Sequence, residues 1–264
     1  MGGGRRALSL FDLTGKSAIV TGSSRGIGKA IAERLAEHGA KVVISSRKVE
    51  ACDAVAAEIN QRFGQGAALS VPASISSKTD LQRLVETTNQ AFGQIDILVA
   101  NAASNPHYGS TLTIEDDAFR KIFENNVLST NWLAQLVTPQ MVERKDGAFI
   151  IVSSIGGLRG SNVIGGYNVS KAADFQLARN LAVELGPHNV RVNCIAPGLV
   201  RTDFAKALWE DPERLKRTTS TTPLRRIGEP DDIAGAAVFL ASAAGAFVTG
   251  QAIVVDGGAT IGWS

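Results

Sequence analysis

The chain has 264 residues, a formal net charge of +2 and only two cysteines. Hydrophobic residues make up 44% of it and charged residues 20%, which is typical of a globular domain with a sizeable core. These values argue against a disulfide framework, a cysteine-rich metal site and a basic nucleic-acid-binding surface. We therefore expect a cytoplasmic protein with no bound metal and no nucleic-acid partner.

Two segments could be taken for a secretory signal or a membrane span. Residues 1–12 carry two arginines but no long apolar core behind them, so they are not a secretory signal, and we expect them to be flexible. From Ile233 to Val255 no residue is charged, which resembles a membrane span. Gly245 and Gly250 interrupt this stretch, which favours a buried helix followed by a short strand. We predict no membrane partner.

Seven short apolar runs rich in Val and Ile recur along the chain, and most are separated by segments with apolar spacing near 3.6 residues. Strands that are apolar throughout are buried on both faces, and strands alternating with helices form a parallel sheet. The sequence predicts an α/β fold over 1–264: a single Rossmann-type doubly wound domain, a seven-stranded parallel sheet with helices on both faces. The expected strands are 17–21, 41–45, 67–71, 95–100, 148–153, 190–195 and 252–256.

A glycine-rich turn, TGSSRGIGKA, follows the first expected strand and begins a helix. Its glycines stand at 22, 26 and 28, a G-x-x-x-G-x-G spacing. Backbone N–H groups and the positive helix end converge there, and glycines allow a pyrophosphate to approach closely. The turn indicates dinucleotide binding, although a glycine-rich turn alone also occurs in ordinary loops.

The end of the second expected strand, ISSRK, indicates which dinucleotide is bound. Ser46 stands where an acidic residue would accept from a ribose 2′-hydroxyl, and Arg47 follows it. Arg25 lies in the glycine-rich turn. Two guanidiniums and no carboxylate favour NADP(H), with NAD(H) as the alternative. The competing interpretation is that both arginines are solvated surface charges.

The stretch YNVSK places Tyr167 four residues before Lys171, on one face of a helix. Alone, this pair is more often part of an ordinary amphipathic helix than of an active site. The other motifs of the chain decide between these interpretations.

Taken together, the motifs resemble the short-chain dehydrogenase/reductase family in its short single-domain form. TGSSRGIG matches its glycine motif, YNVSK its Tyr-x-x-x-Lys signature, and Ser154 the serine thirteen residues earlier. Asn126 in ENNVLS, NAA at 101–103 and APGLVRT at 196–202 match further motifs. Within the family, the chain is most similar to NADP-dependent carbonyl reductases of the dehydrogenase/reductase member-4 type. Gluconate 5-dehydrogenases and 3-oxoacyl-carrier-protein reductases are also similar.

The resemblance implies the roles of the site residues. Tyr167 is the general acid or base, and Ser154 holds the substrate oxygen. Lys171 lowers the pKa of Tyr167 and binds the nicotinamide ribose, while Asn126 anchors a water of a proton relay. The expected cofactor-binding residues are Gly22, Ser24, Arg25, Gly26, Ile27, Gly28, Ser46, Arg47, Ser74, Asn101, Ala102, Lys171, Pro197, Gly198, Val200 and Thr202.

Two positions depart from the family pattern. Ser74 in VPASIS replaces an aspartate that often bonds the adenine amine, and we expect altered adenine contact without loss of binding. Ala103 replaces a glycine, which is tolerable where the backbone angles are ordinary.

The expected substrate is a ketone, an aldehyde or a secondary alcohol with an apolar body. Residues 199–217 contain Phe204, Leu208 and Trp209 and are expected to form a lid. Asn105, His107 and Tyr108 either line the entrance or pack as an ordinary loop. A non-catalytic dinucleotide-binding protein is the remote alternative. A methyltransferase is disfavoured because Arg47 stands where an acidic ribose partner is needed.

A homotetramer is expected by resemblance, with a dimer as the alternative. The helices expected at about 113–144 and 166–186 are those that family members bury in a four-helix interface. The apolar residues of the first exceed the needs of one sheet-facing stripe: Ile122, Phe123, Leu128, Trp132 and Leu136.

Overall fold

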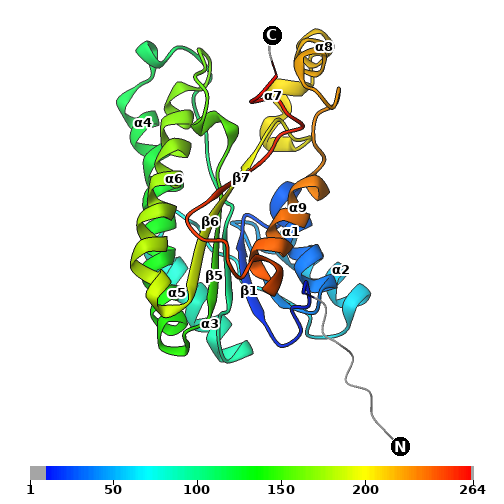
Figure 1. The fold of residues 1–264 in the computed structure, drawn as a ribbon, viewed down its shortest axis with the longest axis vertical. Helices are drawn as coiled ribbons and strands as arrows, with labels where there is room; N and C mark the ends of the chain where they lie inside the picture. The colour runs from blue at the N-terminus through cyan, green and yellow to red at the C-terminus, as the bar shows by residue number, and fades with distance from the viewer. Residues whose placement is uncertain (1–9, 263–264) are drawn as a thin grey trace, which may run out of the picture.

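The computed structural model describes residues 10–262, in which seven parallel strands form one sheet in the order β3-β2-β1-β4-β5-β6-β7 (Figure 1). The expected fold is confirmed, and each strand lies within two residues of its expected bounds. The strands are β1 (Ser17–Thr21), β2 (Lys41–Ser45), β3 (Ala68–Ser70), β4 (Ile97–Ala100), β5 (Gly147–Val152), β6 (Val190–Pro197) and β7 (Ala252–Val255).

Helices cover both faces of the sheet (Figure 1). On one face α1 (Gly26–Glu37), α2 (Val49–Phe63) and α9 (Pro230–Ala241) enclose one half of the core. On the other face α3 (Lys78–Phe92), α5 (Ser129–Arg144) and α6 (Gly165–Leu185) enclose the second half. Because both faces are covered, the strand side chains are buried throughout β1 and β5, as the apolar runs predict.

The sheet reverses its winding at β1, which pairs with β2 on one side and β4 on the other. In open parallel sheets, ligands bind beyond the carboxyl ends of the strands at such a switch point. At this end of the sheet Figure 1 shows α4 (Asp116–Phe123) on one side and α7 (Lys206–Trp209) with α8 (Pro212–Thr221) on the other. The fold therefore directs attention to the turns after β1, β4, β5 and β6.

The helix expected at 113–144 is interrupted. The α4 helix ends at Phe123, a π-helical turn η2 follows at Glu124–Leu128, and α5 continues from Ser129. Such turns insert one extra residue into a helix and are frequent at functional sites. Asn126 lies within this one, a feature that apolar periodicity does not reveal.

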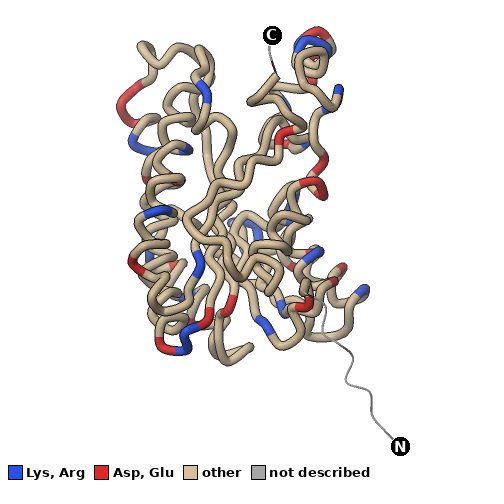
Figure 2. Tube along the Cα trace, viewed as in Figure 1, with Lys and Arg blue, Asp and Glu red and all other residues tan. Residues whose placement is uncertain are grey.

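Short 3-10 turns complete the described chain: η1 (Thr111–Thr113), η3 (Ile155–Gly157), η4 (Gly186–His188), η5 (Asp203–Ala205) and η6 (Ala243–Gly245). Of the N-terminal segment expected to be flexible, residues 1–9 lie outside the described residues, and the Leu10 carbonyl accepts a hydrogen bond from Ala244 N. No helix between residues 10 and 262 is long and apolar enough to cross a membrane. Acidic and basic residues are interspersed along the outer helices (Figure 2).

Candidate active site

The glycine-rich turn leaves a cradle of backbone at the start of α1. Gly22 and Gly26 have φ angles of +66° and +57°, which disfavour other residues. A Cβ on Gly28 would lie 2.4 Å from the Gly22 carbonyl oxygen, so only glycine lets the helix approach the turn this closely. The N-cap residue Arg25 makes no capping hydrogen bond, so its side chain satisfies none of the first N–H groups of α1. This cradle fits a dinucleotide pyrophosphate.

Asn101, directly after β4, ties the cradle to the sheet. Its Nδ2 atom donates to the Thr21 and Gly22 carbonyls at 2.9 and 3.2 Å. The backbone N–H groups of Asn101 and Ala102 both donate to the Thr21 hydroxyl at 3.1 Å. Ala103 is absent from the described non-glycine residues with positive φ, so its backbone angles are ordinary. The NAA segment thus supports the turn that would hold the cofactor.

The two arginines expected at the adenosine end differ in their surroundings. Arg25 pairs with Asp203 at 3.1 Å, a partner that the sequence analysis did not anticipate. Arg47 is exposed, and no carboxylate of the described chain pairs with it. The Ser46 hydroxyl lies 3.1 Å from the Cys52 sulfur, next to Arg47. Of the two guanidiniums, only that of Arg47 is free to receive a 2′-phosphate without giving up an ion pair.

The remaining expected cofactor residues lie around these groups. The Ser74 hydroxyl lies 2.9 Å from that of Ser76. Strand β6 ends at Pro197, and a Cβ on Gly198 would lie 2.8 Å from Asp256 Cα, so this glycine allows a close backbone approach. Thr202 caps η5 by accepting from Ala205 N. The positions expected to touch cofactor on this side are Ile27, Pro197, Gly198, Val200 and Thr202, and all five line the same cavity.

Tyr167 and Ser154 meet at the floor of that cavity. Ser154 caps η3 after β5, and its hydroxyl accepts from Gly156 N at 2.9 Å. Tyr167 lies in the first turn of α6 and is 9% exposed. The preceding Gly166 packs against α4 and against Ile114, which precedes this helix in the chain: a Cβ on Gly166 would lie 3.0 Å from Ile114 and 3.4 Å from Phe119 and Ile122 of α4. The phenol and the serine hydroxyl thus come together from two elements.

Opposing effects act on the pKa of Tyr167. Burial raises the pKa of Tyr167 above its ordinary value of 10, while the Lys171 ammonium and the Ser154 hydroxyl lower it. The negative charge of Asp174 adds to the effect of burial, and the net shift is upward. The ammonium thus acts in the expected direction, but among the protein groups burial outweighs it. The phenol is therefore held in its acid form.

Lys171 is buried, 3% exposed, with its Nζ atom 5.7 Å from the centre of the Tyr167 ring. Nζ donates to the Val152 carbonyl and to Asp174 Oδ2, each at 3.0 Å. Asp174 is fully buried and was missed by the sequence analysis, although its i+3 spacing from Lys171 was a signal for it. A buried carboxylate thus belongs to the same cluster as the expected catalytic pair.

Both the oxygen and the nitrogen of the Asn126 side-chain amide form hydrogen bonds, which hold the side chain in place. Its Oδ1 accepts from Ser104 N at 2.8 Å, and its Nδ2 donates to the Ser104 carbonyl and the Ser170 hydroxyl. The structure thus links the π turn, the segment after β4 and the helix of Lys171. Asn125 adds a bond to the Ser104 hydroxyl, so Ser104 and Ser170 are further residues of this site.

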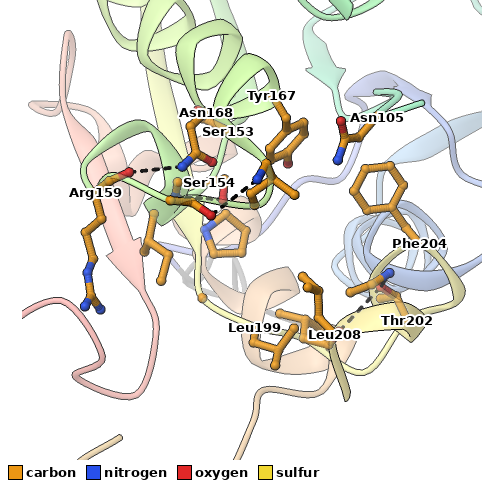
Figure 3. A pocket seen from close by; sticks show the side chains of 18 of the residues that line it. Asn105, Ser153, Ser154, Arg159, Tyr167, Asn168, Leu199, Thr202, Phe204 and Leu208 are labelled. Atoms are coloured by element: carbon orange, nitrogen blue, oxygen red, sulfur yellow. Dashed lines mark hydrogen bonds between the residues drawn. The ribbon is translucent and has the colours of Figure 1, made fainter. Parts of the chain in front are cut away.

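The cavity has a volume of about 300 Å³, the lower end of the range for small-molecule sites. Figure 3 shows Tyr167 and Ser154 close together, with Asn105 nearby and Phe204 across from the phenol ring. The Tyr167 and Phe204 ring centroids are 6.0 Å apart. Most of the cavity wall is apolar, and it is formed by Ile27, Ile155, Ile164, Leu199, Val200, Phe204 and Leu208. Tyr108 and Arg159 also line the cavity.

The segment expected to be a lid forms η5, α7 and α8. Trp209 bonds within this segment: its indole N–H donates to the Thr202 carbonyl at 2.9 Å, and the Arg201 guanidinium stacks on the indole ring. Trp209 therefore braces the segment, while Phe204 and Leu208 reach the cavity. His107 lies near Ser110, with Nε2 3.2 Å from the Ser110 carbonyl, and Tyr108 lines the cavity.

No group of three or more His, Cys, Asp or Glu that could bind a metal occurs in the described part of the chain. The reactive groups of the site are thus a phenol, an ammonium, a serine hydroxyl and an amide, arranged beside a cradle for a dinucleotide.

This combination of sheet order, glycine cradle and Ser-Tyr-Lys cluster is shared with a known family. A family profile described as "Enoyl-(Acyl carrier protein) reductase" matches residues 22–260. The chain belongs to the short-chain dehydrogenase/reductase family of oxidoreductases.

Several individual proteins are similar to this chain. "Dehydrogenase/reductase SDR family member 4" of Bos taurus and of Homo sapiens are each 43% identical over 249 residues, covering 93% of this chain and 88% of theirs. A 7 alpha-hydroxysteroid dehydrogenase complexed with NADH and 7-oxo glycochenodeoxycholic acid is 39% identical, with a TM-score of 0.90 over 94% of this chain and 95% of its own. A gluconate 5-dehydrogenase from Burkholderia cenocepacia, in complex with NADP and tartrate, is 32% identical, with a TM-score of 0.91 over 96% and 98%.

Proposed function

We propose that the protein transfers a hydride between NADP(H) and a ketone, an aldehyde or a secondary alcohol. The observation that carries this proposal is the position of Tyr167 and Ser154 at the floor of a largely apolar cavity that also contains Gly198 and Ile27. The substrate oxygen and the cofactor would thus be held in the same space. The cofactor, when bound, supplies or accepts the hydride, and the protein supplies position and proton transfer.

The residues act on the substrate oxygen. Ser154 donates a hydrogen bond to it and shares the negative charge that develops there. Tyr167 gives its phenolic proton to that oxygen in reduction and takes one back in oxidation. A phenol is protonated at neutral pH, so Tyr167 has a proton to donate in reduction. Lys171 holds a positive charge next to the phenol, and Asn126 fixes the neighbouring segment.

Preference for NADP(H) over NAD(H) is part of the proposal and rests on Arg47 and Ser46. The absence of a carboxylate at Ser46 and the unpaired guanidinium next to it favour a 2′-phosphate. The similar structures do not decide the matter, since one is a complex with NADH and another a complex with NADP.

For the substrate, the apolar wall supports a carbonyl compound with an apolar body. One observation favours a second candidate, a hydroxy acid as in gluconate 5-dehydrogenases: Arg159 lies at the cavity and is exposed. Its guanidinium already donates to the Ala259 carbonyl at 2.6 Å, so an acid would share it. A 3-oxoacyl thioester is a further alternative, but its long chain would have to extend out of this small cavity.

The test is the oxidation of NADPH and of NADH by the purified protein with ketones, aldehydes, diketones, keto acids and a 3-oxoacyl thioester. Turnover of apolar carbonyls with a marked preference for NADPH supports the proposal. Equal rates with NADH overturn the cofactor assignment, and turnover confined to sugar acids favours the second candidate. If neither these nor alcohols with NADP⁺ react, a non-catalytic dinucleotide-binding role is the better explanation.

We also propose a homotetramer in the cytoplasm. Of the five apolar residues expected in excess, Ile122 is buried, and Trp132 and Leu136 pack against the core. Leu128 remains exposed, and Val169 and Val183 on α6 are 50% and 80% exposed. The free, buried Cys52 and Cys194 suit a reducing compartment. Sedimentation tests the assembly: Val183→Lys should reduce the mass, Val49→Lys on α2 should not, and a monomeric parent protein contradicts it.

A further inference from the structure

The cluster behind Tyr167 contains one charged group that the proposed function does not use. Asp174 is fully buried on α6, three residues after Lys171. Its Oδ2 atom lies 3.0 Å from Lys171 Nζ, and its Oδ1 atom has no hydrogen-bond partner among residues 10–262. A buried carboxylate oxygen without a partner costs stability. The core on this face of the sheet is otherwise apolar and includes Phe175, Ala178 and Cys194, so packing alone does not call for a carboxylate on this side of α6.

We propose that Asp174 is a positioning residue: it is the counter-ion that keeps the buried Lys171 ammonium charged and directed at the Val152 carbonyl, beneath Tyr167. The proposal rests on the proposed function only as far as catalysis is concerned. The ion pair itself is a feature of the fold.

The geometry supports this role. Among the described residues, Lys171 Nζ has two hydrogen-bond acceptors, the neutral Val152 carbonyl and Asp174. An ammonium buried without a counter-ion gives up its proton readily, since desolvation disfavours the charged form. Tyr167 needs a positive neighbour when its oxygen becomes negative. Asp174 therefore secures the charge on which the Tyr167–Lys171 pair depends.

The pKa direction of Lys171 agrees with the geometry. Burial is the largest effect and lowers the pKa of Lys171, but the attraction and hydrogen bond of Asp174, together with smaller effects of Tyr167 and Cys194, outweigh it, so the net shift is upward. For Asp174, burial raises the pKa and outweighs the Lys171 ammonium and the Ser153 hydroxyl, which lower it, so its net shift is also upward. The other groups facing the pair are Tyr167 on α6, the Cys194 thiol on β6 and the Ser153 hydroxyl after β5. Burial also raises the pKa of Cys194, so this thiol stays neutral and cannot replace the carboxylate.

The first test needs neither substrate nor cofactor. With Asp174 present, the folded-state pKa of Lys171 lies above its unfolded value, so this contribution to stability is present at neutral pH and is lost as pH rises through the folded pKa. In Asp174→Asn, burial places the pKa of Lys171 below its unfolded value, so stability is lost as pH falls and is recovered as pH rises. The melting-temperature deficit of the variant should thus be largest at neutral pH.

We expect Asp174→Asn to lower the melting temperature by about 10 °C near pH 7. The deficit should shrink to less than half of this near pH 10. The matched control is Asp117→Asn, which removes the same charge from an exposed i,i+3 pair with Arg120. Its small effect should not depend on pH in this range. A deficit in Asp174→Asn that is the same at every pH means that Asp174 is merely structural and overturns the proposal.

A second variant covers the case in which Asp174→Asn does not fold. The double variant Lys171→Met/Asp174→Leu removes both charges, and replacing a whole buried ion pair is often neutral. We expect it to fold with a melting temperature close to that of the parent. If it also fails to fold, the position is needed for packing and the proposal is wrong.

The kinetic test separates this proposal from the proposed function. In Asp174→Asn, the turnover number should fall, and the loss should increase with pH as Lys171 gives up its proton. Asp174→Glu should restore part of the rate. A uniform loss with an unchanged pH profile overturns the role in catalysis. If the parent protein turns over no carbonyl or alcohol, the proposed function fails while the melting test still decides on Asp174.

Discussion

Arg25 of the glycine-rich turn and Asp203 of η5 form an ion pair, with Nη1 and Oδ2 3.1 Å apart. Both side chains are largely exposed, so the pair contributes little to stability. Its effect is to join the proposed cofactor cradle to the segment that carries Phe204. A 2′-phosphate that binds Arg25 must replace the Asp203 carboxylate, whereas Arg47 has no such competitor among the described residues.

Arg47 is therefore expected to determine most of the cofactor preference. Arg47→Ala should weaken NADPH binding about tenfold or more, the size of a lost charge-assisted hydrogen bond, and leave NADH binding nearly unchanged. Titration of each reduced cofactor by fluorescence measures both constants. Lys48→Ala, next to it and equally exposed, is the control and should have little effect. Equal weakening of NADPH and NADH would show that Arg47 does not contact the 2′-phosphate.

Gly28 is expected to tolerate no side chain. In Gly28→Ala the new Cβ meets Gly22 O and Asn101 Nδ2 at about 2.4 and 2.5 Å, so the turn must move. The melting temperature should fall by about 2 to 10 °C and cofactor affinity should fall with it. Gly235→Ala on α9, where nothing lies within 4 Å, is the control and should be neutral or stabilising. Undiminished cofactor affinity in Gly28→Ala would disprove the close-approach argument.

Tyr167→Phe should retain cofactor binding and lower turnover by about 10²–10⁴, because the proton donor is lost while the ring remains. Single-substrate kinetics and a cofactor titration separate the two effects. The chain has only one other tyrosine, Tyr108, which lines the same cavity. Tyr108→Phe should change the Michaelis constant more than turnover. Near-normal turnover in Tyr167→Phe would remove the basis of the proposed mechanism.

Phe204 should contribute to the binding of apolar substrates. It faces Tyr167 from η5, and Phe204→Ala should raise the Michaelis constant for a bulky apolar ketone about tenfold or more, from the lost apolar contact. A small ketone that does not reach the ring should be affected less. Phe247→Ala makes the same change at a fully exposed site and serves as the control. If both ketones respond equally, Phe204 acts on the fold of the segment and not on the substrate.

The fold could be predicted from the sequence because its determinants are local. Runs such as SAIVT and KVVIS are apolar throughout, which only strands buried on both faces require, and they form β1 and β2 with nearly the expected bounds. The π turn at Glu124–Leu128 could not be predicted, since it arises from the packing around Asn126 and leaves the apolar pattern almost unchanged.

The candidate site was predictable where residue type and spacing carry the chemistry, as for Ser154, Tyr167 and Lys171. It was not predictable where distant segments meet. The Arg25–Asp203 pair joins residues 178 positions apart, and Ser104 reaches Asn126 across 22. Asp174 lies close in sequence, but its charge gains meaning only from burial. The net direction of the Tyr167 pKa shift depends on burial in the same way.

The π turn also constrains the length of the chain. A regular helix advances about 100° per residue, so deleting one residue from Glu124–Leu128 would restore uniform winding but rotate α4 by roughly that angle relative to α5. Ile114 and Phe119 would then leave Gly166, and the start of α6 with Tyr167 would lose its support. The segment should therefore accept many substitutions but no single-residue deletion: a Val127 deletion that kept full activity and melting temperature would contradict this. The site therefore depends on the number of residues in the π turn more than on their types.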